Sequence, residues 1–172
     1  MSALPSRTKL CQNAAPKMTA DGRIFRHPEP ARPGSRVWPV FLSYQGCPGR
    51  CVFCAQHLQS GTRPQPLEAT LARLEQELTA AARAGQGPYE LAFYGGVFTA
   101  LPWPWPARFL AVAEQFRQIG LIGRVRCSTR PDACPPALLA ELAGLGLSLV
   151  EIGVQTFDDA VLAAAGRGHD AD

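Results

Sequence analysis

Segments that favour strand and segments that favour helix alternate four times after residue 36, and this alternation restricts the folds open to the chain. Each expected strand is a short apolar run that ends at a glycine, a proline or a polar turn. The first run contains Pro39, which cannot donate a ladder hydrogen bond, so we expect that strand to start at or after Val40. The four runs cover residues 37–43, 89–94, 124–128 and 147–154.

Helical periodicity marks the segments that follow these strands, and the expected helices cover residues 67–84, 107–119, 135–143 and 157–165. In the second of them an apolar stripe is expected to face the core, formed by Phe109, Val112, Phe116 and Ile119. Such repetition predicts parallel βα units with right-handed crossovers. A closed barrel of eight units needs about 250 residues. We therefore expect an α/β fold that is half of a parallel βα barrel, with about four units, and a truncated chain.

The first 36 residues differ from the rest in composition. They contain five prolines and seven lysines or arginines but only two acidic residues, whereas the remainder has ten basic and twelve acidic residues. We expect an extended basic leader over residues 1–36, with a short strand near residues 24–25, and a domain over residues 37–172. Scattered charges are typical of a solvated tail, although a basic segment also suits contact with nucleic acid.

The bulk composition indicates a globular protein, with 47% hydrophobic and 18% charged residues among 172. The sequence has no run of roughly 18 apolar residues that could span a membrane and no signal-peptide pattern near its start. We expect a cytoplasmic protein that contacts no membrane. In a reducing compartment its six cysteines are expected to be metal ligands, catalytic thiols or buried side chains before disulfides.

Three of the cysteines follow the first expected strand at CxxxCxxC spacing: Cys47, Cys51 and Cys54. Three thiolates on one short loop can each bind a different iron of a cubane cluster, which leaves the fourth iron without a protein ligand. Electron-transfer clusters usually have four cysteines, so an open iron indicates a cluster that binds substrate. A zinc site that uses His57 as fourth ligand is the alternative, although zinc ribbons usually place their ligands in two distant pairs.

This cysteine motif resembles that of the radical SAM superfamily, in which an aromatic residue precedes the third cysteine, as Phe53 does here. The wider string over residues 41–57 is similar to bacterial radical SAM proteins related to the elongator catalytic subunit, and the resemblance extends over residues 37–169. It implies a 4Fe–4S cluster on Cys47, Cys51 and Cys54, and S-adenosylmethionine (SAM) as the second cofactor.

Further motifs at the ends of the later strands fit the same resemblance. Gly95 and Gly96 follow the second strand, where the family has a glycine motif that contacts the amino group of SAM; Val97 replaces the usual polar residue. The string at residues 128–132 resembles a family motif whose polar groups, here Ser128 and Arg130, approach the SAM carboxylate or ribose.

The last two motifs lie beyond the third expected helix. Gln155 resembles a glutamine that binds the SAM ribose, and Arg167 resembles an arginine that meets the SAM carboxylate. Glu151 is costly to bury in an apolar strand unless it is paired, so we expect it to face a polar pocket or solvent. Asp158 or Asp159 is expected to cap the last helix, and Cys127 to be a buried small side chain.

The resemblance implies reductive cleavage of SAM to a 5′-deoxyadenosyl radical that removes a hydrogen atom from a substrate, with a low-potential electron donor as partner. The substrate of the elongator-like relatives is tRNA. Their acetyltransferase domain has no counterpart in this sequence, so the basic leader is the feature that favours RNA. Two alternatives remain open at this point: a truncated fragment that binds a cluster without turnover, and a zinc-binding module.

Overall fold

The computed structural model describes residues 36–61 and 63–171, and the expected leader, including the strand near residues 24–25, lies almost entirely outside them. Four parallel strands form one sheet in the order in which they occur along the chain. They are β1 (Arg36–Phe41), β2 (Tyr89–Tyr94), β3 (Ile122–Thr129) and β4 (Leu149–Ile152). The expected half of a parallel βα barrel is confirmed.

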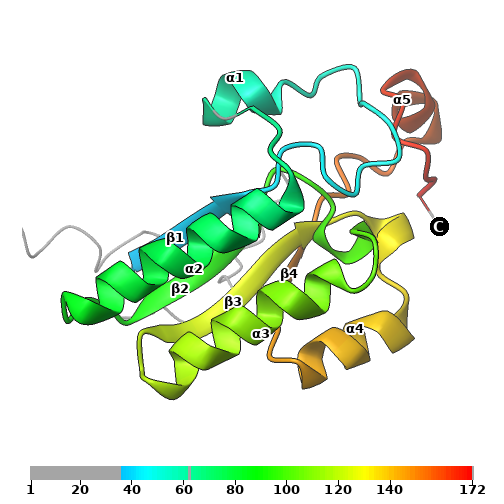
Figure 1. Cartoon of the computed structure of the whole chain (residues 1–172). Helices are drawn as coiled ribbons and strands as arrows, with labels where there is room; N and C mark the ends of the chain where they lie inside the picture. Colours follow the sequence, from blue (N-terminus) through cyan, green and yellow to red (C-terminus); the bar gives the residue numbers. More distant parts are fainter. Residues whose placement is uncertain (1–35, 62, 172) are drawn as a thin grey trace, which may run out of the picture. The chain divides into compact units, whose positions relative to one another are not determined.

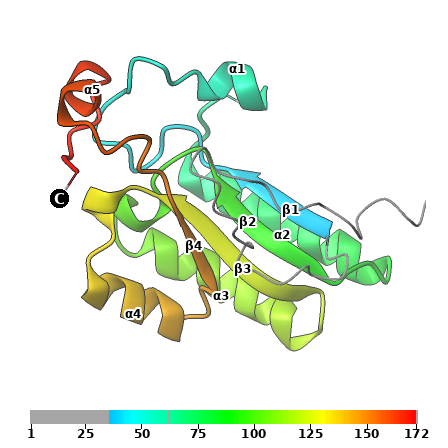
Figure 2. The same cartoon turned by 180° about the vertical axis from the view of Figure 1, so that it is seen from behind.

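Three helices cover one face of the sheet, and Figure 1 shows them in front of the strands. They are α2 (Leu67–Arg83), α3 (Trp105–Gln118) and α4 (Pro136–Gly144). Seen from behind in Figure 2, the other face carries none of the described helices. The short elements lie at the carboxyl ends of the strands: helices α1 (Gln56–Ser60) and α5 (Asp159–Ala164), and 3-10 turns η1 (Phe98–Ala100) and η2 (Pro131–Ala133).

The hydrophobic core lies between the sheet and these three helices. Phe93 of β2 stacks on Phe98 with ring centroids 4.6 Å apart and meets Phe109 of α3 edge-on at 5.4 Å. Each of the three rings is at most 1% exposed. Burying a side chain of this size stabilises the fold by about 1.5–3 kcal/mol, so this aromatic cluster is a major part of what holds α3 and η1 to the sheet.

The first strand starts earlier than predicted, at Arg36, and it includes Pro39. β1 is an edge strand, and its even-numbered residues face β2, since Leu42 beyond its end donates to the carbonyl of Tyr94 at 2.7 Å. In a parallel ladder the intervening residues point their backbone groups the other way. The nitrogen of Pro39 therefore faces the side of β1 with which no other strand in residues 36–61 and 63–171 pairs, so the ladder that is described loses no hydrogen bond.

Two other expectations about the elements were wrong in detail. Ile119 does not pack inward but is 64% exposed, because α3 ends at Gln118 and the chain turns away there. The fourth strand is shorter than the predicted residues 147–154. It ends at Ile152 because the next residues turn: Val154 donates back to the carbonyl of Ile152, and Gln155 has a positive φ of 76°.

No helix in residues 36–61 and 63–171 has the length and apolar character that crossing a membrane requires.

Candidate active site

The segments that follow the four strands meet at one edge of the sheet, as the carboxyl ends of parallel strands must. A cavity of about 540 Å³ opens there. All nine residues singled out from the sequence line it: Cys47, Cys51, Cys54, Gly95, Gly96, Ser128, Arg130, Gln155 and Arg167. Residues up to 120 positions apart thus contribute to one cavity.

The cysteine loop, residues 42–55, is held against the end of β2 by backbone hydrogen bonds. Tyr44 donates to the carbonyl of Gly95 at 3.0 Å, and Val97 donates to that of Gln45 at 2.9 Å. Gly46 has a φ of 74°, and a Cβ there would collide with the carbonyl of Val97. Glycine at this position therefore allows the two loops to touch.

The reason for Gly96 differs from the one the sequence suggested. A Cβ on Gly96 would collide with the carbonyl oxygens of Gln45 and Leu42. The close approach that requires glycine is thus made by the backbone of the cysteine loop itself. Gly95, with a φ of 83°, supplies the turn that precedes it. The pair fixes the cysteine loop and also lines the cavity.

The three thiols of the loop are not oxidised to disulfides, and they differ in burial: Cys51 is buried, and Cys47 and Cys54 are half-buried. Burial raises the pKa of the Cys47 thiol, and the neighbouring Cys54 adds to this effect. The positive charges of Arg130 and Arg167 oppose the rise. The two cations therefore offset part of the rise in the pKa of Cys47.

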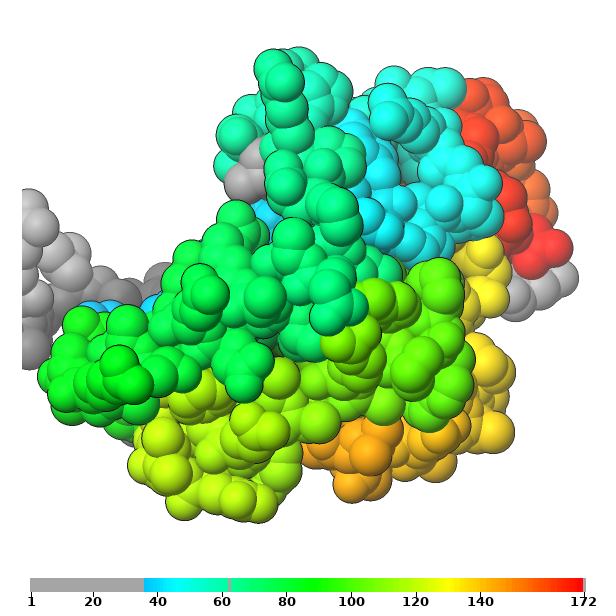
Figure 3. All heavy atoms as spheres, viewed as in Figure 1, coloured from blue at the N-terminus to red at the C-terminus, as the bar shows by residue number. Residues whose placement is uncertain are grey.

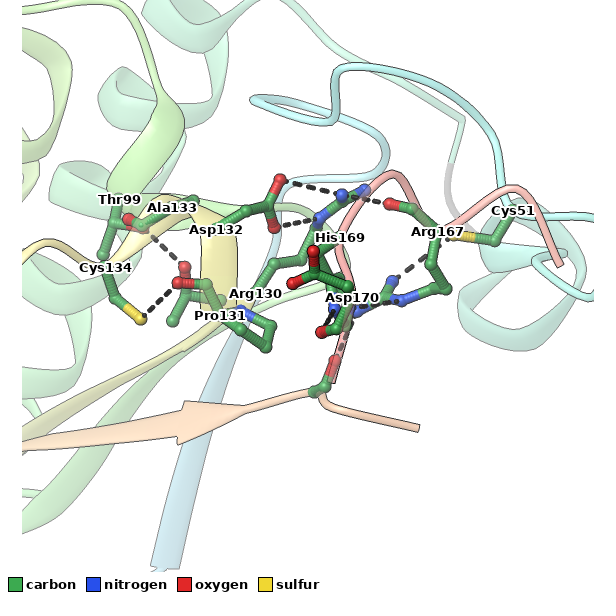
Figure 4. Close-up of polar contacts among 12 residues, drawn as sticks. Cys51, Thr99, Arg130, Pro131, Asp132, Ala133, Cys134, Arg167, His169 and Asp170 are labelled. Atoms are coloured by element: carbon green, nitrogen blue, oxygen red, sulfur yellow. Dashed lines mark hydrogen bonds and ion pairs between the residues drawn. The ribbon is translucent and has the colours of Figure 1, made fainter. Parts of the chain in front are cut away.

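Arg130 follows β3 directly and is only 5% exposed. Its Nε and one Nη donate to the two carboxylate oxygens of Asp132 at 2.8 and 2.9 Å, as Figure 4 shows. Burial alone would raise the pKa of the Asp132 carboxyl, but the hydrogen bonds and charge of Arg130 outweigh it, so the pKa is lowered. The same guanidinium also donates to the backbone carbonyl of Arg167.

Arg167 lies beyond α5 and reaches back across the site (Figure 4). One of its Nη atoms is 3.3 Å from Sγ of Cys51, the other donates to the carbonyl of Gly153, and Nε is 3.3 Å from Nε2 of His169. Val52 donates to the carbonyl of Ala165 at 3.0 Å. In Figure 3 the atoms of the cysteine loop accordingly lie against those of the last helix.

The ends of β3 and β4 add a polar wall to the cavity. Glu151 accepts a hydrogen bond from Ser128 at 3.4 Å and forms an ion pair of 3.1 Å with Arg126, which confirms that it faces a polar environment. Gln155 is exposed on the turn after β4. Asp158 caps α5 by accepting from the backbone of Val161 at 3.1 Å, also as expected.

Sequence reasoning missed several side chains of the site. Arg50 lies inside the cysteine motif and stacks on the ring of Tyr44 with its guanidinium carbon 4.3 Å from the centroid. Gln56 accepts from the backbone of Tyr44 at 2.6 Å. Asp132 holds Arg130, and the sequence offered a signal for this pair, because an acidic residue stands two positions after the arginine. The contact of Gln56 with Tyr44 depends on how the cysteine loop folds back, which the sequence does not reveal.

His57 does not take the place that the zinc alternative gives it. It is exposed, its Nδ1 lies 3.0 Å from the Tyr44 hydroxyl, and it is not among the residues that line the cavity. Across residues 36–61 and 63–171, no three His, Cys, Asp or Glu side chains converge as ligands of a single metal ion. A cubane cluster does not require such convergence, because each thiolate binds a different iron.

A parallel βα sheet whose cavity opens at the carboxyl ends of its strands, beside a three-thiol loop, is typical of α/β proteins that bind a ligand at that edge. The sequence model of the radical SAM superfamily matches residues 41–172, and the chain belongs to that superfamily. Members of the superfamily use a 4Fe–4S cluster and SAM.

Individual relatives are distant. The chain is 26% identical over 172 aligned positions to the tRNA uridine(34) acetyltransferase of Methanocaldococcus jannaschii, which covers 79% of this chain and 32% of the relative. It is 26% identical to the mitochondrial radical S-adenosyl methionine domain-containing protein 1 of Bos taurus, covering 84% and 33%. Coproporphyrinogen III oxidase from Escherichia coli shares the fold, with 21% identity, a TM-score of 0.57, and coverage of 79% and 31%. The chain thus spans about a third of the length of these relatives.

Proposed function

We propose that this chain holds a 4Fe–4S cluster on Cys47, Cys51 and Cys54, binds SAM in the adjoining cavity and cleaves it reductively. The observation that carries the proposal is the convergence of all nine predicted site residues on one cavity. These residues come from four separate strand ends and from the segment beyond α5. A purely structural role for each motif would not require them to share a cavity.

The donor set fits the cluster. Three thiols line the cavity, and the lining includes no fourth cysteine and no histidine. Such a set leaves one iron open for a second ligand, whereas electron-transfer clusters have four cysteines. The cavity volume of about 540 Å³ lies within the usual range of about 300–1,000 Å³ for small-molecule sites. A zinc site would need a further ligand, and the carboxylate in the lining, Glu151, is already paired with Arg126 and Ser128.

The side chains around the cavity would hold SAM by complementary charge and hydrogen bonding. Arg167 carries five N–H donors, three of which are used by Cys51, Gly153 and His169. Two remain for the SAM carboxylate. Arg130 uses its Nε and one Nη on Asp132 and the backbone of Arg167, so it would position Arg167, and its other Nη remains for SAM.

The remaining contacts would be made at the strand ends. The backbone of Gly95 and Gly96 would accept hydrogen bonds from the SAM amino group, and Gln155 and Ser128 would contact the ribose. When bound, the two cofactors supply electron transfer from a low-potential donor and cleavage of the carbon–sulfur bond to give a 5′-deoxyadenosyl radical. The chain's contribution is to orient the reactants and exclude water.

An RNA substrate is the second part of the proposal. Two observations support it: the relatives named tRNA uridine(34) acetyltransferase, and the excess of basic over acidic residues in the first 36 positions. Filter binding of a tRNA mixture to the 172-residue chain, across a salt series, tests it. We expect binding that weakens steeply with salt. Equal retention of tRNA by the chain and by an unrelated protein of equal charge would contradict it.

The experiment for the cofactor proposal is anaerobic reconstitution with iron and sulfide, followed by metal analysis and electron paramagnetic resonance (EPR). We expect about four iron and four sulfide per chain and a reduced-cluster spectrum that changes when SAM is added. Zinc without sulfide would establish the zinc-binding module instead. A cluster spectrum that SAM leaves unaltered would contradict the proposed SAM site.

A further inference from the structure

Arg167 is held in place from several sides before any cofactor is considered. Its side chain is buried, with the residue only 6% exposed, and contacts Cys51, Gly153 and His169 (Figure 4). Its backbone carbonyl accepts a hydrogen bond from Arg130. Each of the three guanidinium nitrogens makes a contact, so the side chain is fixed in one conformation. Its contact in the cysteine loop is Cys51.

That partner is the most buried of the three thiols. Nη1 of Arg167 lies 3.3 Å from Sγ of Cys51, whereas Cys47 and Cys54 are half-buried. A donor directed at a cluster-ligating sulfur, in a buried environment, stabilises the more negative, reduced state of the cluster. Outer contacts of this kind also orient the ligand itself.

The contact couples the two ends of the domain. The segment that carries Arg167 is attached to the cysteine loop a second time, by the hydrogen bond from Val52 to Ala165. Arg130, at the end of β3, holds the backbone of Arg167 and is itself held by Asp132. The position of Cys51 therefore depends on the segment beyond α5 as well as on its own loop.

We propose that Arg167 is a positioning residue that fixes Cys51 and raises the reduction potential of the cluster, in addition to any contact with SAM. This inference rests on the proposed function, because it concerns the cluster that Cys51 would hold. It assigns to Arg167 an effect that is present before SAM binds. A residue that served SAM alone would leave the SAM-free cluster unaltered.

The first test compares the unaltered chain with the conservative variant Arg167→Lys. The chain is produced with arginine labelled with ¹⁵N only in the guanidino group, then reconstituted and reduced without SAM. Pulsed EPR detects labelled nitrogen that lies close to the paramagnetic cluster. We expect the strongest ¹⁵N coupling to be lost in Arg167→Lys, while weaker coupling from Arg130 and Arg50, which line the same cavity, remains. A cluster without any ¹⁵N coupling, or a spectrum that is the same in Arg167→Lys, would overturn the inference.

The second test is a redox titration of the SAM-free cluster, followed by EPR. In Arg167→Gln we expect the ratio of reduced to oxidised cluster at a fixed potential to fall about tenfold, which corresponds to about 59 mV for one electron. In Arg167→Lys this ratio should fall less, because lysine keeps the positive charge but lacks the planar guanidinium group with its several N–H donors. Arg50→Gln is the matched control, since Arg50 lines the same cavity but is exposed and stacks on Tyr44.

These outcomes separate the inference from the proposed function. Equal shifts in Arg167→Gln and Arg50→Gln would overturn the role of Arg167, because general charge would then explain the effect. If Arg167→Gln fails to hold a cluster, the ¹⁵N comparison of the unaltered chain with Arg167→Lys decides. Failure of the unaltered chain to form any cluster would instead overturn the proposed function.

Discussion

Alternate residues of each strand point to opposite faces of the sheet, and the two faces have different roles. On β3, Val125 and Cys127 point to the helix-covered face and are fully buried, while Arg126 and Ser128 point to the other face and are half-buried. Arg126 there bridges Glu90, at 3.7 Å, and Glu151. The apolar face stabilises the fold, and the polar face leads to the cavity. Substitutions on the two faces should therefore be separable by what they damage.

The largest effect is expected from the cysteine loop. Cys51→Ala should abolish cluster assembly, because it removes one of only three protein ligands, and leave the far-ultraviolet circular dichroism spectrum unchanged. The control is Cys127→Ala, the same substitution at a cysteine of the apolar face. It should keep its iron and cost about 1 kcal/mol of stability. Equal iron contents in the two variants would contradict the division between the faces.

A substitution in the aromatic cluster should show the reverse pattern. Phe109→Ala removes a fully buried ring and should lower the unfolding free energy by about 3–5 kcal/mol. Urea unfolding of the cofactor-free chain measures the loss. Under conditions where the variant remains folded, we expect it to bind iron and sulfide as the unaltered chain does. Full stability in Phe109→Ala would show that the core is not where we place it.

The junction between the faces can be tested with two glycines of the site. Gly96→Ala would place a Cβ against the carbonyls of Gln45 and Leu42, so it should destabilise the chain by about 1–3 kcal/mol and reduce cluster yield. Gly49→Ala is the control, because nothing lies within 4 Å of a Cβ there. It should change the unfolding free energy by less than about 0.5 kcal/mol. The reverse ranking of the two variants would refute the packing of the glycine pair against the loop.

The smallest effect concerns pH. Burial raises the pKa of Cys127 to about 12, from an ordinary value of 9.0, with a further contribution from the Glu151 carboxylate. A pKa raised by folding gives stability that is present below about pH 9 and is lost as pH rises toward 12. Between pH 8 and 10, Cys127→Ala should therefore lose about 1 kcal/mol less unfolding free energy than the unaltered chain does. Parallel pH profiles of the two proteins, measured by urea unfolding, would contradict this.

Much of the fold could be predicted from the sequence because apolar periodicity, and the glycines and prolines that end helices and strands, are local features. The bounds of β2 were predicted as observed, at Tyr89–Tyr94, since the apolar run stops at a glycine pair. Pro39 misled the prediction for β1, because whether a proline costs a hydrogen bond depends on the strand lying at the edge of the sheet. The inward position predicted for Ile119 was wrong because apolar periodicity does not reveal where a helix, here α3, ends.

The candidate site was predictable as a set of motifs but not as an arrangement. Spacing identified the three cysteines, and resemblance supplied the glycine pair, Gln155 and the two arginines. The contact between Arg167 and Cys51 joins residues 116 positions apart, so no local pattern could report it. The same holds for Gly96, whose need for glycine comes from a neighbouring loop rather than from a ligand.

The central claim is that the three-thiol loop and the cavity beside it cleave SAM. The most direct measurement is the amount of 5′-deoxyadenosine and methionine formed when the reconstituted 172-residue chain is incubated anaerobically with SAM and a low-potential reductant. We predict equal amounts of the two products, dependent on the reductant and absent from Cys51→Ala. A chain that holds an intact 4Fe–4S cluster and forms neither product would contradict the claim and leave a cluster-binding protein without turnover.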